Sequence, residues 1–184
     1  MKLPLLLAGL LALVVSTALA QEAERFKYAD LPIDATTHLV TYTDVVRATG
    51  ATKEQLCLRA KAWATSSFMD SERAPQMFDG AAGTYSCRGA VHLPYGTTYS
   101  MVLAIQAKDG SYRYTINQLF YAYNASSSDA LSGTQAESVE HWATYKKKNL
   151  HYVDVRIHEV RQFLPELLAS LHAAMSTEIP EATR

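Results

Sequence analysis

Histidine and cysteine carry the most obvious chemistry in this sequence, which has six histidines and two cysteines. Metal sites need such residues at particular spacings. His158 and Glu159 begin like the metalloprotease motif HExxH, but Gln162 stands where the second histidine is required. No other histidine has zinc-motif spacing, so we expect no metal site and no cofactor.

Nucleophilic catalysis also lacks a candidate residue. The chain has no GxSxG elbow, and Cys57 and Cys87 fall on expected core surfaces rather than in an electropositive pocket. The Gly-Ala-Ala-Gly run at residues 80–83 lies between two expected strands and matches no phosphate-binding loop. We therefore expect no enzymatic activity, with a small hydrolase-type enzyme of unrecognised site as an alternative.

The two cysteines leave two structural alternatives open. In an oxidising compartment Cys57 and Cys87 can pair. Such a disulfide closes a loop of about thirty residues and stabilises the fold by about 3 kcal/mol in the chain-entropy model. The alternative is two buried free thiols that pack as small apolar side chains.

A set of polar side chains gives the sequence its candidate binding site. Alternation of apolar and polar residues over 84–117 places this set on the face of an expected sheet that points away from the helices. Guanidinium and amide groups there can bind an anionic or peptide-like ligand. The alternative is an ordinary solvated sheet face, with Gln106 opposite Arg113 as a cross-strand pair. The set is Arg88, His92, Gln106, Arg113 and Asn117, with Thr115 beside them.

Two tight turns predict the strand register that positions this set. Pro94 and Gly96 suit a short hairpin loop that aligns Val91 with Tyr99. The Asp109-Gly110 turn pairs Ile105 with Tyr114 and Gln106 with Arg113. A slip of one residue would invert both faces, so turn and pattern support the same register. Four tyrosines then face inward as packing residues: Tyr85, Tyr99, Tyr112 and Tyr114.

The remaining elements follow from caps and periodicity. We expect a strand at 38–47, a helix from the capping box Thr52-Lys53-Glu54-Gln55 to about Phe68, and a short strand at 76–78. A loop at 124–133 precedes a second capping box at 134–137, which opens a short helix to about Lys147 with Val139 and Trp142 inward. The last helix covers about 155–175, and Pro165 should kink or split it near Phe163. The order β-α-β-β-β-β-α-α predicts an α+β fold, an antiparallel meander with helices packed on one face.

The first twenty residues are typical of a signal peptide. Lys2 precedes an apolar run, and Ala18-Leu19-Ala20 provides a cleavage site. We expect an exported protein, periplasmic or secreted, with no stable membrane span after cleavage. The expected organisation is a signal peptide at 1–20, a lead-in segment at 21–36, a single domain at 37–176 and a tail at 177–184.

Charge excludes one class of partner. The chain has 17 basic and 18 acidic side chains. This balance lacks the concentrated positive charge that nucleic-acid binding requires. We expect no nucleic-acid partner, and an unidentified small ligand or envelope protein in its place.

Several segments together resemble an uncharacterised family of exported bacterial proteins, a domain of unknown function with a fold like that of the TATA-binding protein (TBP-like). The most specific of them is Lys-Asp-Gly-Ser-Tyr-Arg-Tyr-Thr-Ile at 108–116, and the others are 31–34, the Thr52 helix with Trp63, 79–83 and 171–175. The resemblance covers about residues 31–176. It implies a curved antiparallel sheet backed by helices, and no known activity or catalytic residues. The fold name does not imply DNA binding, because function depends on sites rather than folds.

The leading functional hypothesis is a non-enzymatic, exported binding or interaction module. A complete scaffold with polar groups on one sheet face and no catalytic set favours it. The near alternative is a homo-oligomeric structural protein of the cell envelope, which would use an uncovered sheet face or edge strand.

Overall fold

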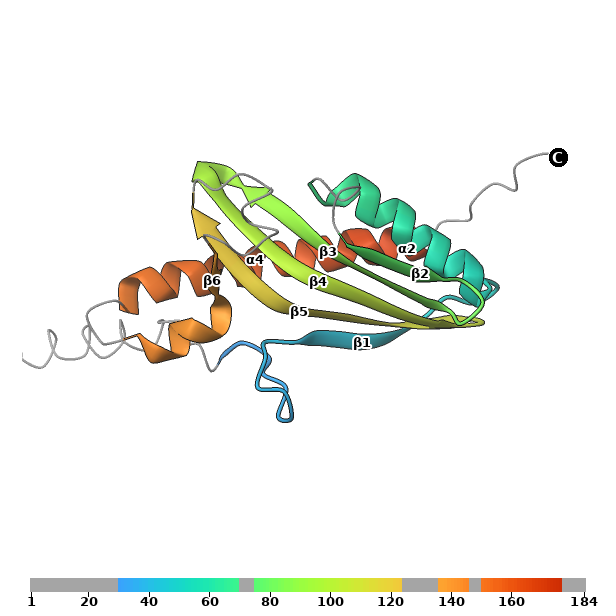
Figure 1. Ribbon diagram of the computed structural model, residues 1–184, viewed down its shortest axis with the longest axis horizontal. Helices are drawn as coiled ribbons and strands as arrows, with labels where there is room; N and C mark the ends of the chain where they lie inside the picture. The colour runs from blue at the N-terminus through green and yellow to red at the C-terminus, as the bar shows by residue number, and fades with distance from the viewer. Residues whose placement is uncertain (1–29, 70–74, 124–135, 146–149, 177–184) are drawn as a thin grey trace, which may run out of the picture.

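The computed structural model describes residues 30–69, 75–123, 136–145 and 150–176 (Figure 1). Within these ranges no helix is both long and apolar enough to cross a membrane. The elements are β1 (Tyr42–Arg47), α2 (Lys53–Ser67), β2 (Gln76–Asp79), β3 (Thr84–Leu93), η2 (Pro94–Gly96), β4 (Thr97–Lys108), β5 (Ser111–Tyr123), β6 (Glu137–Ser138), η3 (Val139–Thr144) and α4 (Leu150–Ser176).

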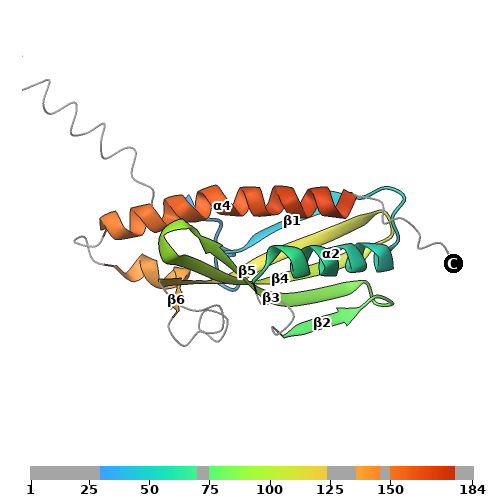
Figure 2. The same cartoon turned by 90° about the horizontal axis from the view of Figure 1, so that it is seen from above.

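The strands form one antiparallel sheet in the order β1-β5-β4-β3-β2, and β6 pairs with the far end of β5. The long helices α2 and α4 lie on the same side of this sheet (Figure 2). The fold is therefore α+β with two layers, as predicted. The opposite side of the sheet, which we call the open face, carries no helix among the described elements.

Both hairpins have the predicted register. Val91 lies opposite Tyr99 on β3 and β4, and Gln106 lies opposite Arg113 on β4 and β5. Gly96 and Gly110 have φ of +79° and +78°, a left-handed conformation that glycine adopts without steric cost. The four tyrosines predicted to face inward are all buried.

The predicted capping box starts α2. Thr52 Oγ1 accepts a hydrogen bond from the Gln55 N–H at 3.2 Å, and Gln55 Oε1 accepts one from the Thr52 N–H at 2.9 Å. A third acceptor comes from the β4–β5 turn, because Asp109 Oδ1 accepts the Lys53 N–H at 2.8 Å. This bond fixes the start of α2 beside the turn, at the edge of the open face.

The core lies between the sheet and the two helices. Trp63 of α2 is buried, and its Nε1 donates to Ser170 of α4 at 2.9 Å. Arg59 Nη1 donates to the Met175 carbonyl at 2.8 Å, near the end of α4. A cation is favourable there because the carbonyls of a helix C-terminus carry partial negative charge. These bonds join the two helices above the sheet.

The first strand is shorter than predicted. It begins at Tyr42 rather than residue 38, and His38 has φ of +58°, a left-handed conformation outside the extended range of a regular strand. Asp34 explains the difference: its carboxylate accepts the N–H groups of Thr36 and Thr37, so the chain turns before the strand. Only the single bridge between Ile33 and Val40 forms in this segment.

The second predicted capping box is wrong as far as the structure describes it. Thr134 and Gln135 lie outside the described residues. Glu137 and Ser138 form β6 against β5, and the following helix is a 3-10 helix that ends at Thr144. Ser138 is the cap, since its Oγ accepts the Glu140 N–H, while Glu137 accepts a bond from the Tyr145 hydroxyl. Val139 and Trp142 are buried as predicted.

The last helix is longer than predicted and is not split. α4 begins at Leu150 and continues through Pro165 to Ser176. Proline removes one helical hydrogen bond, but Phe163, Leu164 and Leu171 are buried on either side of it. Packing against the sheet therefore holds the helix together across the lost bond.

Candidate functional site

Register arranges the side chains of the open face in rows that cross the strands. Rows are about 7 Å apart, because successive side chains on one face of a strand are two residues apart. Counting from the β4–β5 turn, row one holds Arg47, Ser111 and Lys108; row two Val45, Arg113, Gln106 and Thr84; row three Thr43, Thr115, Ala104 and Ser86; and row four Asn117, Val102 and Arg88.

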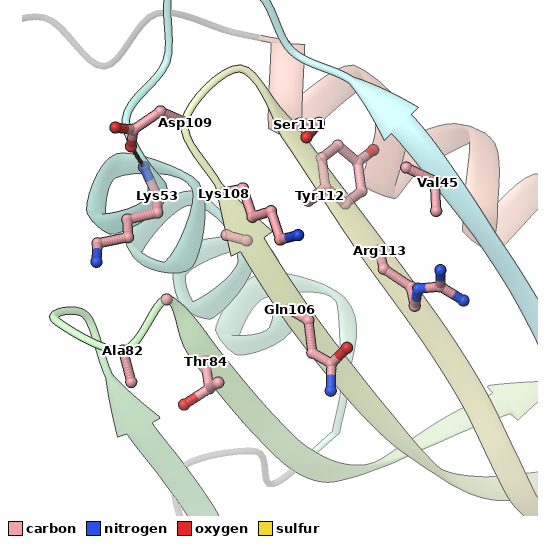
Figure 3. Close-up of a pocket in the computed structure, with 12 residues that line it drawn as sticks. Val45, Lys53, Ala82, Thr84, Gln106, Lys108, Asp109, Ser111, Tyr112 and Arg113 are labelled. Carbon is pink, nitrogen blue, oxygen red and sulfur yellow. Dashed lines mark hydrogen bonds between the residues drawn. The ribbon is translucent and has the colours of Figure 1, made fainter.

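Except for Arg47, the residues of rows one and two line an open groove of about 780 Å³ at the turn (Figure 3). We call it the turn-end groove. Its floor comes from β4 and β5, and the turn at Gly83 and the start of α2 border it. The lining is Val45, Lys53, Ala82, Gly83, Thr84, Gln106, Ala107, Lys108, Asp109, Ser111, Tyr112 and Arg113.

The turn-end groove is cationic. Lys53, Lys108 and Arg113 line it with one carboxylate, Asp109, which already accepts the Lys53 N–H. Figure 3 shows the Lys108 ammonium on the Arg113 side, whereas Lys53 points the other way. Among the described residues, neither Lys108 nor Arg113 forms a hydrogen bond or ion pair through its side chain. Both cations are therefore available to an anion.

A β-bulge interrupts the open face beyond row four. The β4–β5 register shifts between Ser100 and Val102, and Gln118 has φ of +50°. Its Oε1 accepts a bond from Arg88 Nη2 at 2.9 Å, and the Arg88 guanidinium lies 5.7 Å from the centroid of the Phe120 ring. We call Arg88, Gln118 and Phe120 the bulge cluster. It holds Arg88 flat across β4.

The strands that carry the open face belong to a stretch of the chain that is similar to a known family. Residues 42–122 match the family described as a domain of unknown function (DUF4468) with TBP-like fold. The chain contains a DUF4468 domain. This match runs from the start of β1 to Ala122, one residue before the end of β5, and thus includes every row of the open face. No curated protein matches the chain.

Solved structures share the fold of the DUF4468 domain. A TBP-like protein from Parabacteroides distasonis is 17% identical with a TM-score of 0.53, over 79% of this chain and 98% of that one. A DUF4468 family protein from Bacteroides ovatus is 13% identical with a TM-score of 0.55, over 83% of this chain and 94% of that one. At such identities the likeness shows the fold alone.

The structure separates the five predicted ligand-binding residues of the DUF4468 domain. Gln106 and Arg113 lie side by side in the groove, whereas Arg88 and Asn117 lie two rows away. His92 is eight residues beyond Thr84 on β3, roughly 26 Å along the strand, and its Nδ1 pairs with Thr98 Oγ1 at 3.0 Å. The five therefore do not converge on one compact ligand.

Sequence reasoning missed Lys108 and Lys53. Lys108 alternates in phase with Gln106 and belongs to the same face, but its place next to the Asp-Gly turn hid that role. Lys53 reaches the groove only because Asp109 caps α2, a contact between residues 56 positions apart. The alternation of polar and apolar residues could have identified Lys108, whereas the position of Lys53 follows only from the tertiary structure.

The two cysteines of the DUF4468 domain are buried free thiols in the structure. Burial raises the pKa of both Cys57 and Cys87, so each favours the protonated, unreactive form. Among the described residues, no three side chains of the His, Cys, Asp or Glu types gather as metal ligands.

A second polar cluster joins α4 to β4 on the helix side. Arg156 Nη1 donates to both carboxylate oxygens of Glu159 at 2.7 and 2.8 Å, and the Tyr99 hydroxyl donates to Glu159 Oε2 at 2.9 Å. The Arg156 guanidinium also lies 4.6 Å from the Tyr121 ring centroid. Burial and the Glu159 carboxylate raise the pKa of Tyr99. Because these groups are bonded to one another, the cluster serves to hold α4 on the sheet.

Proposed function

We propose that this protein is an exported, non-enzymatic binding module that binds an anionic ligand in the turn-end groove. The observation that carries the proposal is a pair of cations, Lys108 and Arg113, whose side chains have no hydrogen-bond or ion-pair partner among the described residues, in a groove of about 780 Å³. Export rests on the signal-peptide pattern of residues 1–20.

The chemistry of the lining supports an anion rather than an apolar or cationic ligand. A guanidinium presents fixed donors that match a carboxylate or phosphate, and an ammonium adds a point charge. Gln106, Thr84 and Ser111 add amide and hydroxyl donors around Arg113. The groove is open to water, so screening weakens each charge and makes binding sensitive to salt.

Titration of the purified chain with citrate tests this function. We expect saturable binding by calorimetry, and a loss of about fivefold in affinity for Arg113→Gln, an exposed charge-assisted contact. Lys61→Gln is the matched control, because Lys61 is an exposed cation of α2 that lies over Phe78 outside the groove. Absence of citrate binding, or equal losses in both variants, would contradict the proposal.

A further inference from the structure

We propose that the bulge cluster is a second anion subsite, and that the ligand of the open face is an extended acidic peptide with carboxylates four residues apart. This inference rests on the proposed function of the turn-end groove and specifies its ligand. Three observations support it: the fixed position of Arg88, the placement of Gln118 by the bulge, and the spacing of the two cationic rows.

Arg88 is held in place with donors to spare. Gln118 is its hydrogen-bond partner among the described residues, and the Phe120 ring lies beneath the guanidinium. In register Arg88 faces Val102, so the side chain crosses β4 to reach β5. A guanidinium has five N–H donors, of which this arrangement uses one. The remaining donors are presented to the open face in a fixed orientation.

The bulge is what places Gln118 there. Ile116 and Leu119 are buried on the helix side, whereas both Asn117 and Gln118 turn outward. In a regular strand one of these two neighbours would face the core. The left-handed φ of Gln118 costs about 1 kcal/mol for a residue with a Cβ, and such conformations cluster where geometry serves a site. Two amides thereby stand beside Arg88 on one face.

The spacing of the two rows matches an extended peptide. Rows two and four are four residues apart along the strands, roughly 13 Å between backbone positions. Arg113 lies in row two on β5, and the side chain of Arg88, from row four, reaches β5 at Gln118. Side chains at positions i and i+4 of an extended peptide are separated by the same distance and point to the same side. The floor between the rows consists of small side chains, Ala104, Thr115 and Ser86, without a carboxylate. Two carboxylates of one peptide can therefore contact Arg113 and Arg88 at once, which a compact anion cannot do.

Three blocked peptides with the same backbone length separate the subsites. They are Glu-Ser-Val-Ser-Glu, its single-charge analogue Gln-Ser-Val-Ser-Glu, and the charge-matched Glu-Glu-Ser-Val-Ser. For the unaltered chain we expect the first peptide to bind about fivefold more tightly than either of the others, because it alone reaches both arginines. Equal affinity for the first and third peptides would overturn the spacing argument.

Substitution at the bulge cluster assigns the second contact. Arg88→Ala should remove the advantage of the first peptide and leave the affinity of the single-charge peptide unchanged within about twofold. Arg88→Lys keeps the positive charge but lacks the paired N–H donors of the guanidinium, so this variant should retain part of the first peptide's advantage. It also provides a second test if Arg88→Ala fails to fold. Arg161→Ala on α4 is the control, since Arg161 lies near Asp30 away from the open face.

Different results would contradict anion binding in the turn-end groove and anion binding at the bulge cluster. If citrate and the single-charge peptide bind but Arg88→Ala leaves the first peptide's affinity unchanged, the bulge cluster is not a subsite and the groove still binds anions. If neither citrate nor any peptide binds, the proposed function fails and this inference fails with it.

Discussion

Gly89 shows how closely single residues are packed beneath the sheet. A Cβ added at this position would lie 2.2 Å from the Phe68 ring, which is itself buried and packs edge-on against Trp63 at 5.2 Å between centroids. We expect Gly89→Ala to lower the free energy of unfolding by about 2–3 kcal/mol, through forced displacement of the ring. Urea unfolding measures this change.

Phe68 provides the internal control for this prediction. Phe68→Ala alone should destabilise through the cavity it leaves, by about 3–5 kcal/mol. In the double variant the new methyl group occupies part of that cavity, so the two losses should sum to more than the observed loss. Additive losses would mean that Gly89 and Phe68 do not meet.

Ionisation of Tyr112 should make the free energy of unfolding depend on alkaline pH. The Tyr112 hydroxyl is buried without a hydrogen-bond partner among the described residues, and burial raises its pKa to about 12. The unfolded chain loses this proton near pH 10, so the folded state binds the proton more tightly. The stabilisation is complete below pH 10 and is lost as the pH rises through 12. The free energy of unfolding should therefore fall over that interval.

Tyr112→Phe tests the same residue at neutral pH. Removal of an unsatisfied buried hydroxyl should leave stability unchanged or raise it by about 1 kcal/mol. Unfolding curves at pH 7.5 and 10.5 should show a smaller alkaline loss for the variant than for the unaltered chain. A marked destabilisation at pH 7.5 would show that the hydroxyl has a partner in solution.

At the level of elements, Asp109 couples the β4–β5 turn to α2. Asp109→Ala removes the acceptor of the Lys53 N–H and should cost about 1 kcal/mol, the usual value of a helix cap. Asp109→Asn keeps an acceptor oxygen but removes the only carboxylate of the turn-end groove lining. This variant should retain most of the stability and bind citrate about twofold more tightly. Weaker citrate binding in Asp109→Asn would contradict the cationic character assigned to the groove.

The elements that were predictable from sequence are those with two agreeing local signals. The hairpin at Asp109-Gly110 combines turn chemistry with alternation on both strands, and α2 combines a capping box with a periodic face. The bulge had no such signal. Residues 118–122 read Gln-Leu-Phe-Tyr-Ala, an apolar run in which either face can be buried, so the reversal at Gln118 depends on packing by the helices.

The candidate site was predictable to the same extent. Gln106 and Arg113 were found together because they share one hairpin. The pairing of β1 with β5, which brings Val45 beside Arg113, joins segments almost 70 residues apart and left no pattern in the sequence. Pro165 illustrates the opposite case, because a local rule predicted a kink or a split near Phe163, and α4 is not split where Leu164 and Leu171 pack in the core.

At the level of the whole molecule, the edges of the sheet decide whether copies of the chain can pair. β1 forms one edge, and its exposed residues include Val45 at 52%. An unpaired strand edge is a template for a second chain. Here the Val45 N–H donates to Asp44 Oδ1 at 2.7 Å, so one edge donor is already occupied and a charge stands beside it.

We therefore expect the protein to be monomeric at micromolar concentration, against the homo-oligomeric alternative. Asp44→Val frees the edge N–H and turns residues 44–46 into three consecutive valines, a segment with high strand propensity and no charge. Light scattering should show a monomer for the unaltered chain and dimers or larger species for Asp44→Val. Asp30→Asn, a loss of charge away from the sheet edge, should stay monomeric. A dimer of the unaltered chain would favour the structural role over the binding module, because a paired β1 edge would place a second copy beside rows one and two of the open face.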